Sequence, residues 1–220
     1  MKKWRLLALP MVLMLTSCQE VTFGLLWGEK RSAGMDNSSY SYNAVSSISY
    51  SYQSNESINT EGQNKTTITF DNIKSSASDI REPGTIASYI QIDSPLFESV
   101  TNPEYFGVKA DGTVYLGADS SYVIGTLTLN FKENIKNVEI TAQPYHYIPT
   151  AFNEEEIKVD DEVAISVNNS GFIKLDCTPD LENFTVPLTK CAYHLNEESK
   201  SITIRVGKRR AILKEIALYY

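Results

Sequence analysis

Alternation of apolar and polar residues along most of the chain after Thr66 is the feature that most limits how this sequence can fold. In ten short segments, apolar residues recur at every second position, and the residues between them are mostly Thr, Ser, Asn or charged. Successive side chains of a strand point to opposite faces, so this period predicts strands with one buried face and one solvated face. The segments are 67–70, 88–92, 113–116, 125–131, 137–142, 162–167, 172–177, 190–195, 201–206 and 211–220.

Strands with one solvated face favour antiparallel pairing, because parallel sheets are buried on both faces. We therefore predict an all-β domain over residues 66–220, a two-sheet antiparallel β-sandwich that is jelly-roll-like. Turn residues at Asp111-Gly112 and at 168–171 separate the predicted strands. In the last segment the alternation slips at Lys214-Glu215, which predicts a β-bulge. The one helical feature expected is a turn at Ser76–Arg81.

The first 17 residues are predicted to be a signal peptide. Basic residues precede an apolar run at 6–15, which is far shorter than the roughly 20 residues that a membrane-spanning helix needs. The residues Leu15-Thr16-Ser17-Cys18 resemble the bacterial lipobox. The resemblance implies that Cys18 carries a diacylglyceryl group and begins the mature protein. Two acyl chains give stable membrane binding, so the protein is expected outside the cytoplasm, anchored by lipid to the bacterial cell membrane.

Residues 18–65 are predicted to form a tether between the lipid and the domain. The stretch after Ser32 is rich in Ser, Asn and Tyr and offers few aliphatic side chains for burial, which favours a flexible chain. Tyrosines nevertheless recur at even spacings between Tyr40 and Tyr52. The alternative that part of this stretch pairs with the sheet therefore stays open.

Charge and motif content exclude several functions. Removal of residues 1–17 takes away three cations and changes the formal net charge from −7 to −10, and an acidic chain is a poor partner for nucleic acid. The sequence has two histidines and contains no P-loop, G-x-S-x-G, H-E-x-x-H or C-x-x-C motif. We therefore expect neither a cofactor nor an enzyme.

Two cysteines remain beside the lipidated one. Cys177 and Cys191 lie on neighbouring predicted strands and point inward, so they can form a disulfide that closes a loop of about 15 residues. The alternative is a pair of reduced thiols in the core. The pattern does not decide between the two.

The most ligand-like stretch is the loop that contains Tyr145, His146 and Tyr147 between two prolines. Aromatic rings on the rim of a sandwich can stack on sugar faces, and the histidine can donate a hydrogen bond. The simpler interpretation is that these rings cover the edge of a sheet.

Two acidic runs, Glu154–Glu156 and Asp160–Glu162, lack the alternating spacing of a calcium-binding loop. They are interpreted as solvated loops, so no metal site is predicted. The basic run Lys208-Arg209-Arg210 follows a glycine and is interpreted as a hairpin turn.

Several segments resemble a β-sandwich module that recurs in secreted proteins and lipoproteins of low-GC Gram-positive bacteria. In that module a leucine-glycine pair and a strand that starts with glycine precede the core, and an aliphatic strand with a terminal aromatic residue closes it. The matching segments are Thr67–Phe70, Val114–Gly117, Ile124–Leu129, Ile202–Ile204 and Ile212–Tyr220. The resemblance implies an accessory or binding domain more often than an enzyme.

The leading hypothesis is a lipid-anchored cell-surface protein that binds or displays, with carbohydrate as the ligand to test. One alternative is a structural or protein-interaction module of the cell envelope that binds a surface protein and no small ligand. Another is a hydrolase with an unrecognised site, which needs a histidine and acidic residues in one concave pocket.

Overall fold

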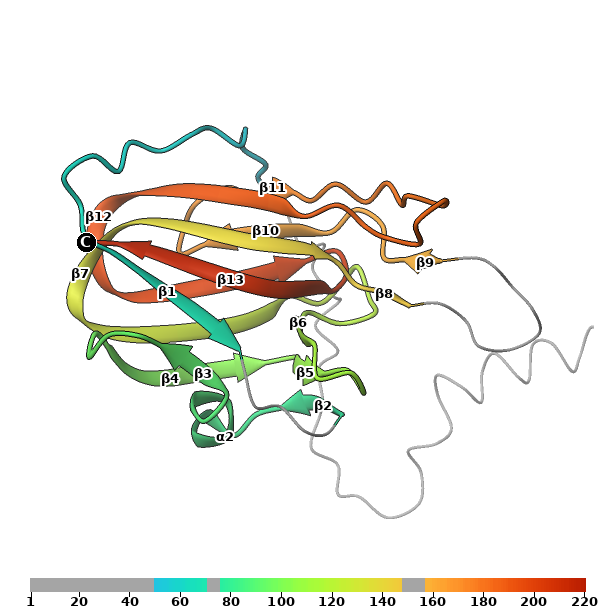
Figure 1. Ribbon diagram of the computed structural model, residues 1–220, viewed down its shortest axis with the longest axis horizontal. Helices are drawn as coiled ribbons and strands as arrows, with labels where there is room; N and C mark the ends of the chain where they lie inside the picture. The colour runs from blue at the N-terminus through green and yellow to red at the C-terminus, as the bar shows by residue number, and fades with distance from the viewer. Residues whose placement is uncertain (1–49, 71–75, 148–156) are drawn as a thin grey trace, which may run out of the picture. The chain divides into compact units, whose positions relative to one another are not determined.

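The computed structural model describes residues 50–70, 76–147 and 157–220, all of which lie in one compact unit spanning Ser47–Tyr220. The described part is built from strands and one short helix, α2 (Pro83–Ala87) (Figure 1). No helix in these ranges is long and apolar enough to cross a membrane. The strands are β1 (Lys65–Phe70), β2 (Ala77–Ile80), β3 (Ile90–Ile92), β4 (Phe97–Glu104), β5 (Phe106–Val108), β6 (Val114–Leu116), β7 (Gly125–Pro144), β8 (His146–Tyr147), β9 (Lys158–Val159), β10 (Ala164–Val167), β11 (Ile173–Lys174), β12 (Thr189–Gly207) and β13 (Ala211–Tyr219).

Two long strands, β7 and β12, pair with each other along most of their length and organise the fold. Both curve round one end of the domain, on the left in Figure 1, so that one hydrogen-bonded antiparallel sheet curls into two layers. Layer A contains β4, residues 125–131 of β7, residues 201–207 of β12, β10 and β11. Layer B contains residues 189–194 of β12, residues 135–144 of β7, β13, β1, β3, β6, β5 and β2.

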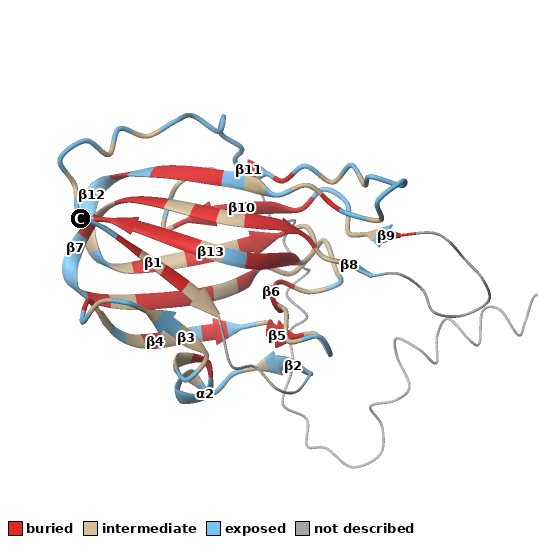
Figure 2. Cartoon of the chain, viewed as in Figure 1, coloured by how far each residue is buried: buried red, intermediate tan, exposed pale blue. Residues whose placement is uncertain are grey.

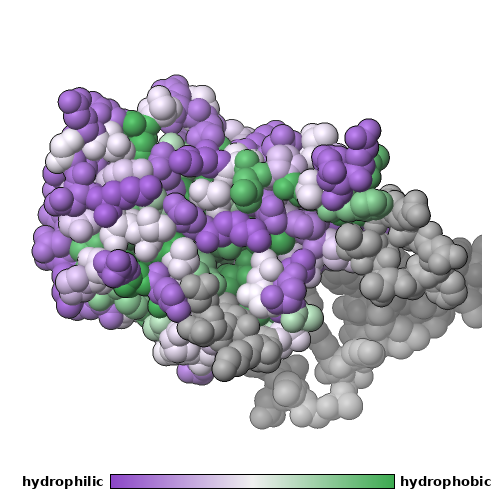
Figure 3. Space-filling view, in the orientation of Figure 1, coloured by the Kyte–Doolittle hydropathy of each residue, from purple (hydrophilic) through white to green (hydrophobic). Residues whose placement is uncertain are grey.

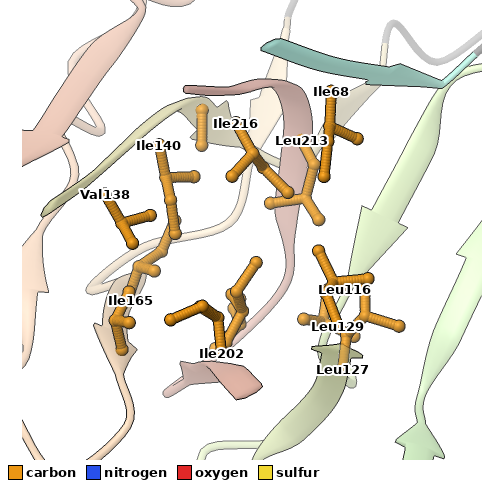
Figure 4. Packing of buried hydrophobic residues seen from close by; sticks show 14 of the residues in the cluster. Ile68, Leu116, Leu127, Leu129, Val138, Ile140, Ile165, Ile202, Leu213 and Ile216 are labelled. Atoms are coloured by element: carbon orange, nitrogen blue, oxygen red, sulfur yellow. The ribbon is translucent and has the colours of Figure 1, made fainter. Parts of the chain in front are cut away.

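The two layers share a single hydrophobic core (Figure 4). The side chain of Tyr193 crosses it, because this residue lies in layer B and its hydroxyl donates a hydrogen bond of 2.7 Å to the carbonyl of Ile165 in layer A. The buried residues run along β7, β12 and β13, whereas the bends of the two long strands are exposed (Figure 2). Side chains from both layers meet in the core, among them Ile68, Leu127, Leu129, Val138, Ile140, Ile202, Leu213 and Ile216.

The prediction of an all-β domain with two antiparallel layers is confirmed. The register of β13 against β7 shifts between Leu213 and Glu215, which is the predicted bulge. The Asp111-Gly112 turn connects β5 to β6, and Gly112 takes the positive φ of 84° that a glycine accommodates without strain.

Three local predictions are wrong. The segments 125–131 and 137–142 belong to one strand, β7, and the segments 190–195 and 201–206 belong to one strand, β12. The stretch Ser76–Arg81 contains strand β2 and no helix. The helix starts at Pro83, where a proline fits because the first turn of a helix has no partner for that N–H group.

Residues 50–64, here called the strap, lie along the sandwich, which extends the compact part of the chain upstream of the predicted start at residue 66. Tyr52 forms a parallel bridge with Phe172, and the carbonyl of Phe172 accepts a hydrogen bond of 3.0 Å from the N–H of Gln53. The strap ends at Asn64, which exchanges two backbone hydrogen bonds with Tyr220. This bridge is isolated and lies next to β11, outside the named strands, and residues 40–49 of the Tyr40–Tyr52 stretch lie outside the described residues. Pairing of that stretch with the sheet therefore stays a prediction.

Asn55 attaches the strap to the edge of β12. Its side-chain amide donates to the carbonyl of Lys190 at 2.7 Å and accepts from the N–H of Ala192 at 3.1 Å, so it replaces the peptide group of a missing neighbour strand. We expect Asn55→Ala to lower the free energy of unfolding by about 1–2 kcal/mol, because two hydrogen bonds are lost. Hydrogen exchange at the Ala192 amide should accelerate, whereas Ser57→Ala on the same strap should leave it unchanged. Equal protection in both variants would contradict this role.

Candidate functional site

The outer face of layer A carries rows of small polar side chains. Register pairing places Ser201, Asn130 and Ser99 in one row across β12, β7 and β4, and it places Thr203, Thr128 and Thr101 in the next. A third row continues from Ser166 of β10 to Arg205 and Thr126. These nine residues define what is here called the polar face: Ser99, Thr101, Thr126, Thr128, Asn130, Ser166, Ser201, Thr203 and Arg205.

Hydrogen bonds fix the side chains of the polar face. The hydroxyls of Thr128 and Thr203 lie 2.9 Å apart, and the amide of Asn130 donates to Ser99 Oγ at 3.1 Å and to Thr101 Oγ1 at 3.2 Å. A hydroxyl group both donates and accepts, and an amide side chain supplies two donors and an acceptor. Apart from the guanidinium of Arg205, the face is therefore an ordered array of neutral hydrogen-bonding groups, in which Thr128 and Ser166 are buried and the others are partly exposed.

An aromatic cluster borders the polar face on the β10–β11 side. The ring of Tyr50 meets Phe172 edge-on with centroids 5.0 Å apart and stacks on Tyr52 with centroids 6.3 Å apart. Gly207 makes room for it, because a Cβ atom there would lie 2.3 Å from the Tyr50 ring. Phe172 is buried, whereas Tyr52 is 42% exposed and presents an aromatic surface to solvent. The guanidinium of Arg205 lies 5.4 Å from the centre of the Phe172 ring and joins the cluster to the polar face.

A groove of about 680 Å³ opens onto the polar face where β12 bends. The β10–β11 turn forms one wall, and residues of β12 form the other. Asn168 in this turn has a positive φ of 51°, and its side-chain oxygen accepts a hydrogen bond of 2.7 Å from the N–H of Thr203. The lining is Val167, Asn168, Asn169, Ser170, residues 194–199, Ser201, Thr203 and Arg205.

A second groove, of about 740 Å³, lies between the strap and layer B and shares the bend of β12 with the first. His194 lines both, and its Nδ1 lies 2.8 Å from Asn137 Oδ1. The Asn137 amide nitrogen already donates to the Asn59 carbonyl and to Gln63 Oε1, so its oxygen must accept and His194 Nδ1 must carry the proton. The histidine thus pairs with a neutral amide. Glu56 and Glu198 line the same groove.

The predicted ligand loop lies outside both grooves. The Tyr145 ring packs edge-on against Tyr115 at 5.1 Å, and the guanidinium of Arg210 lies 3.9 Å from its centre, so the ring takes part in internal contacts. His146 pairs its Nδ1 with the Pro144 carbonyl at 3.0 Å. Tyr147 is 49% exposed and belongs to strand β8. A ligand role for these residues stays a prediction, and Tyr147 is the one of the three whose side chain is exposed for it.

The acidic run at Asp160–Glu162 has partners that the sequence did not suggest. Asp160 accepts two side-chain hydrogen bonds from Arg210, at 2.8 and 2.9 Å, and both side chains are largely buried. Asp161 pairs with Arg209 at 3.4 Å. The interpretation of this run as a solvated loop is therefore wrong for Asp160. The predicted Lys208–Arg210 turn connects β12 to β13. The other acidic run lies outside the described residues, and no group of metal-binding side chains occurs in the ranges that the structure describes.

Cys177 and Cys191 are free thiols in the structure. Burial raises the pKa of the Cys191 thiol to about 12, and it also raises the pKa of the half-buried Cys177. The disulfide stays a prediction, as does lipidation of Cys18, which lies outside the described residues.

A thiol with so high a pKa carries almost no thiolate at neutral pH, and the thiolate is the nucleophile. We expect iodoacetamide at pH 8 to leave Cys191 unmodified in the folded protein and to modify it after unfolding in urea. Mass spectrometry of the peptides that contain Cys177 and Cys191 measures both thiols. Labelling of Cys191 in the folded protein at the rate of an unfolded peptide would contradict its burial, and resistance in urea that reductant removes would show the disulfide.

Comparisons with known proteins add little beyond this geometry. No family model matches the chain, and no curated protein matches it. A solved structure titled "CBM4 structure and function" is similar with a TM-score of 0.28 and 10% identity, over 55% of this chain and 82% of that chain. A likeness this weak says nothing about a ligand of this chain. The fold and the candidate site define a β-sandwich with a polar groove.

Proposed function

We propose that this chain is an extracytoplasmic, lipid-anchored protein that binds polysaccharide on the outer face of layer A and does not catalyse. The observation that carries the proposal is the exposed ring of Tyr52 beside a hydrogen-bonded array of hydroxyl and amide groups that runs into a groove. Sugars present hydroxyl groups at their edges and C–H groups on their faces. An aromatic ring next to neutral hydrogen-bonding groups matches both.

The open shape of the two grooves also favours a polymer as the ligand over a small molecule. The groove at the bend of β12 continues onto the polar face, and a second groove begins across the same bend. Enclosed apolar pockets are typical of sites for small ligands, and the linings of these grooves are mainly polar. A chain of sugar units can lie along open grooves of this kind and make many weak contacts. On the side turned to the viewer in Figure 3, where β13 and β1 of layer B lie in front, hydrophilic side chains also cover much of the surface.

Binding to a panel of immobilised polysaccharides tests the proposal. The full-length protein is purified in detergent, and wild type is compared with Tyr52→Ala, Asn130→Ala and Tyr147→Ala. We expect Tyr52→Ala and Asn130→Ala to weaken binding about 2- to 10-fold, the range for loss of one aromatic contact or one or two hydrogen bonds. Tyr147 is a matched control because it is another partly exposed tyrosine. Weaker binding in Tyr147→Ala alone would move the site to the loop at 145–147, and no retention of wild type on any polymer would overturn the proposal.

Anchoring through Cys18 has an independent test. Metabolic labelling with a fatty acid should mark the wild-type protein, and Cys18→Ala should lose the label and leave the membrane fraction. Equal labelling of both proteins would contradict the lipobox.

A hydrolase is the second candidate, because His194, Glu56 and Glu198 line the same groove, as that hypothesis requires. The pairing of His194 with the amide of Asn137 argues against it, since a catalytic histidine is normally oriented by a carboxylate. Release of reducing sugar from a bound polysaccharide, lost in Glu56→Gln and Glu198→Gln, would favour the enzyme. Retention of polymer without release favours the binding protein.

A further inference from the structure

Three cations gather on the aromatic cluster beside the polar face. Lys174 Nζ lies 4.8 Å from the centre of the Tyr52 ring, and Lys208 Nζ lies 5.1 Å from that of Tyr50. Arg205 stacks on Phe172 at 5.4 Å. These residues come from β11, from the turn between β12 and β13, and from β12, so the fold brings together charges that are far apart in the sequence.

The cluster is positive although the chain has a formal net charge of −7. The positive charge of Lys208 is partly neutralised, because its Nζ lies 3.7 Å from a carboxylate oxygen of Glu162. The Nε–H of Arg205 donates a hydrogen bond of 3.0 Å to Ser166 Oγ, and the Lys174 ammonium lies over the Tyr52 ring. Among the described residues, Lys174 and Arg205 therefore make no carboxylate contact, and an anion can be bound without displacing an internal ion pair.

Arg205 connects the positive cluster to the groove that it helps to line. A guanidinium group can donate two parallel hydrogen bonds to a carboxylate, sulfate or phosphate group. Glu197 and Glu198 line the same groove at the bend of β12 and repel anions there. Negative groups of a ligand are therefore favoured at the end near Tyr52 and disfavoured at the bend.

We propose that the polysaccharide is anionic, with the faces of its sugar rings on Tyr52 and its carboxylate or ester groups on Lys174 and Arg205. This proposal rests on the proposed function and names the class of its ligand. Charge complementarity of this kind gives specificity and makes binding weaker in salt.

Two matched pairs of polymers test the proposal with the full-length protein in detergent. Polygalacturonate is compared with its methyl ester, and dextran sulfate is compared with dextran, so that each pair keeps its backbone and differs in charge. We expect at least one anionic polymer to bind about 10-fold more tightly than its neutral counterpart, with affinity falling as salt is added. Lys174→Gln and Arg205→Gln should each weaken that binding about 2- to 5-fold, the range for one exposed ion pair.

Controls separate the possible outcomes. Lys190→Gln removes another exposed lysine, in layer B, and should leave binding unchanged, and Lys174→Arg should retain it. Equal binding of both members of each pair, or no effect of Lys174→Gln, would overturn the anionic ligand and leave polysaccharide binding standing. Failure of wild type to bind any polymer in the panel would overturn both proposals. Binding to vesicles of anionic lipid that depends on Lys174, without binding to either anionic polymer, would make this surface a membrane contact and would also overturn the proposal.

Discussion

Replacing Gly117 by alanine is expected to lower the free energy of unfolding by about 3–5 kcal/mol. Gly117 has a φ of +108°, a region that L-residues with a side chain rarely adopt, and such strain costs about 1–3 kcal/mol. A Cβ atom there would also lie 2.4 Å from the carbonyl oxygen of Arg209. Because that oxygen belongs to the backbone, relief requires movement of the β12–β13 turn, which adds an overpacking cost of about 1–3 kcal/mol.

Chemical denaturation of Gly117→Ala and Gly84→Ala gives a matched comparison. Gly84 lies in α2, and a Cβ atom there would have no heavy atom within 4 Å. We expect Gly84→Ala to change stability by less than about 1 kcal/mol. A similar small effect in Gly117→Ala would show that the turn adapts freely, contrary to the packing described.

Gly125 explains why the leucine-glycine pair and the glycine at the start of a strand occur together. A Cβ atom at Gly125 would lie 2.4 Å from the backbone nitrogen of Gly117 and 3.2 Å from Leu116 Cγ. The two glycines therefore allow the loop after β6 to approach the start of β7 backbone to backbone. This contact gives the sequence signature a packing role that is independent of ligand binding.

Phe131→Ala is expected to lower the free energy of unfolding by about 3–5 kcal/mol. The Phe131 ring is fully buried in layer A and lies edge-on to Phe97 with centroids 6.3 Å apart. Truncation removes apolar burial and leaves a cavity at the last inward position before β7 bends. Denaturant unfolding measures the loss, and the m-value reports whether the folded state stays equally compact.

Two further variants give stability losses with which that of Phe131→Ala can be compared. Phe97 is partly buried, so Phe97→Ala should cost clearly less than Phe131→Ala. Leu181 is 63% exposed, and Leu181→Ala should be nearly neutral. Equal losses for Phe131→Ala and Leu181→Ala would contradict the position of the core.

Much of the fold follows from the alternation, because a period of two decides which side chains enter the core. Bends inside continuous strands do not follow from it. At Lys132-Glu133-Asn134 three exposed polar residues interrupt the apolar pattern, and a sequence with such an interruption predicts a loop. The structure continues β7 through them, since a strand that bends between two layers exposes its outer residues. The alternation does not predict strand β4 for a related reason: this strand has few inward apolar residues and contains Pro103.

The candidate site could be predicted only in part. Thr126, Thr128 and Asn130 stand at the polar positions of a predicted strand, but their association with Thr203 and Ser99 depends on pairing across strands that are far apart in sequence. The alternation of apolar and polar residues within one segment does not indicate which distant strands pair with each other. The aromatic cluster depends on the strap, whose Ser-, Asn- and Tyr-rich sequence resembles that of a tether. Backbone hydrogen bonds at its two ends, the side-chain amide of Asn55 and the packing of the Tyr50 ring hold the strap in place.

Hydroxyl-radical footprinting of the full-length protein, with and without the polysaccharide that retains it best, tests the central claim most directly. Tyr52 and Tyr147 are both exposed, so both are oxidised in the free protein, and each reports one candidate site. Binding on the outer face of layer A predicts that the polymer protects Tyr52 and leaves the oxidation of Tyr147 unchanged. Protection of Tyr147 with no change at Tyr52 would contradict the assignment of the site to that face.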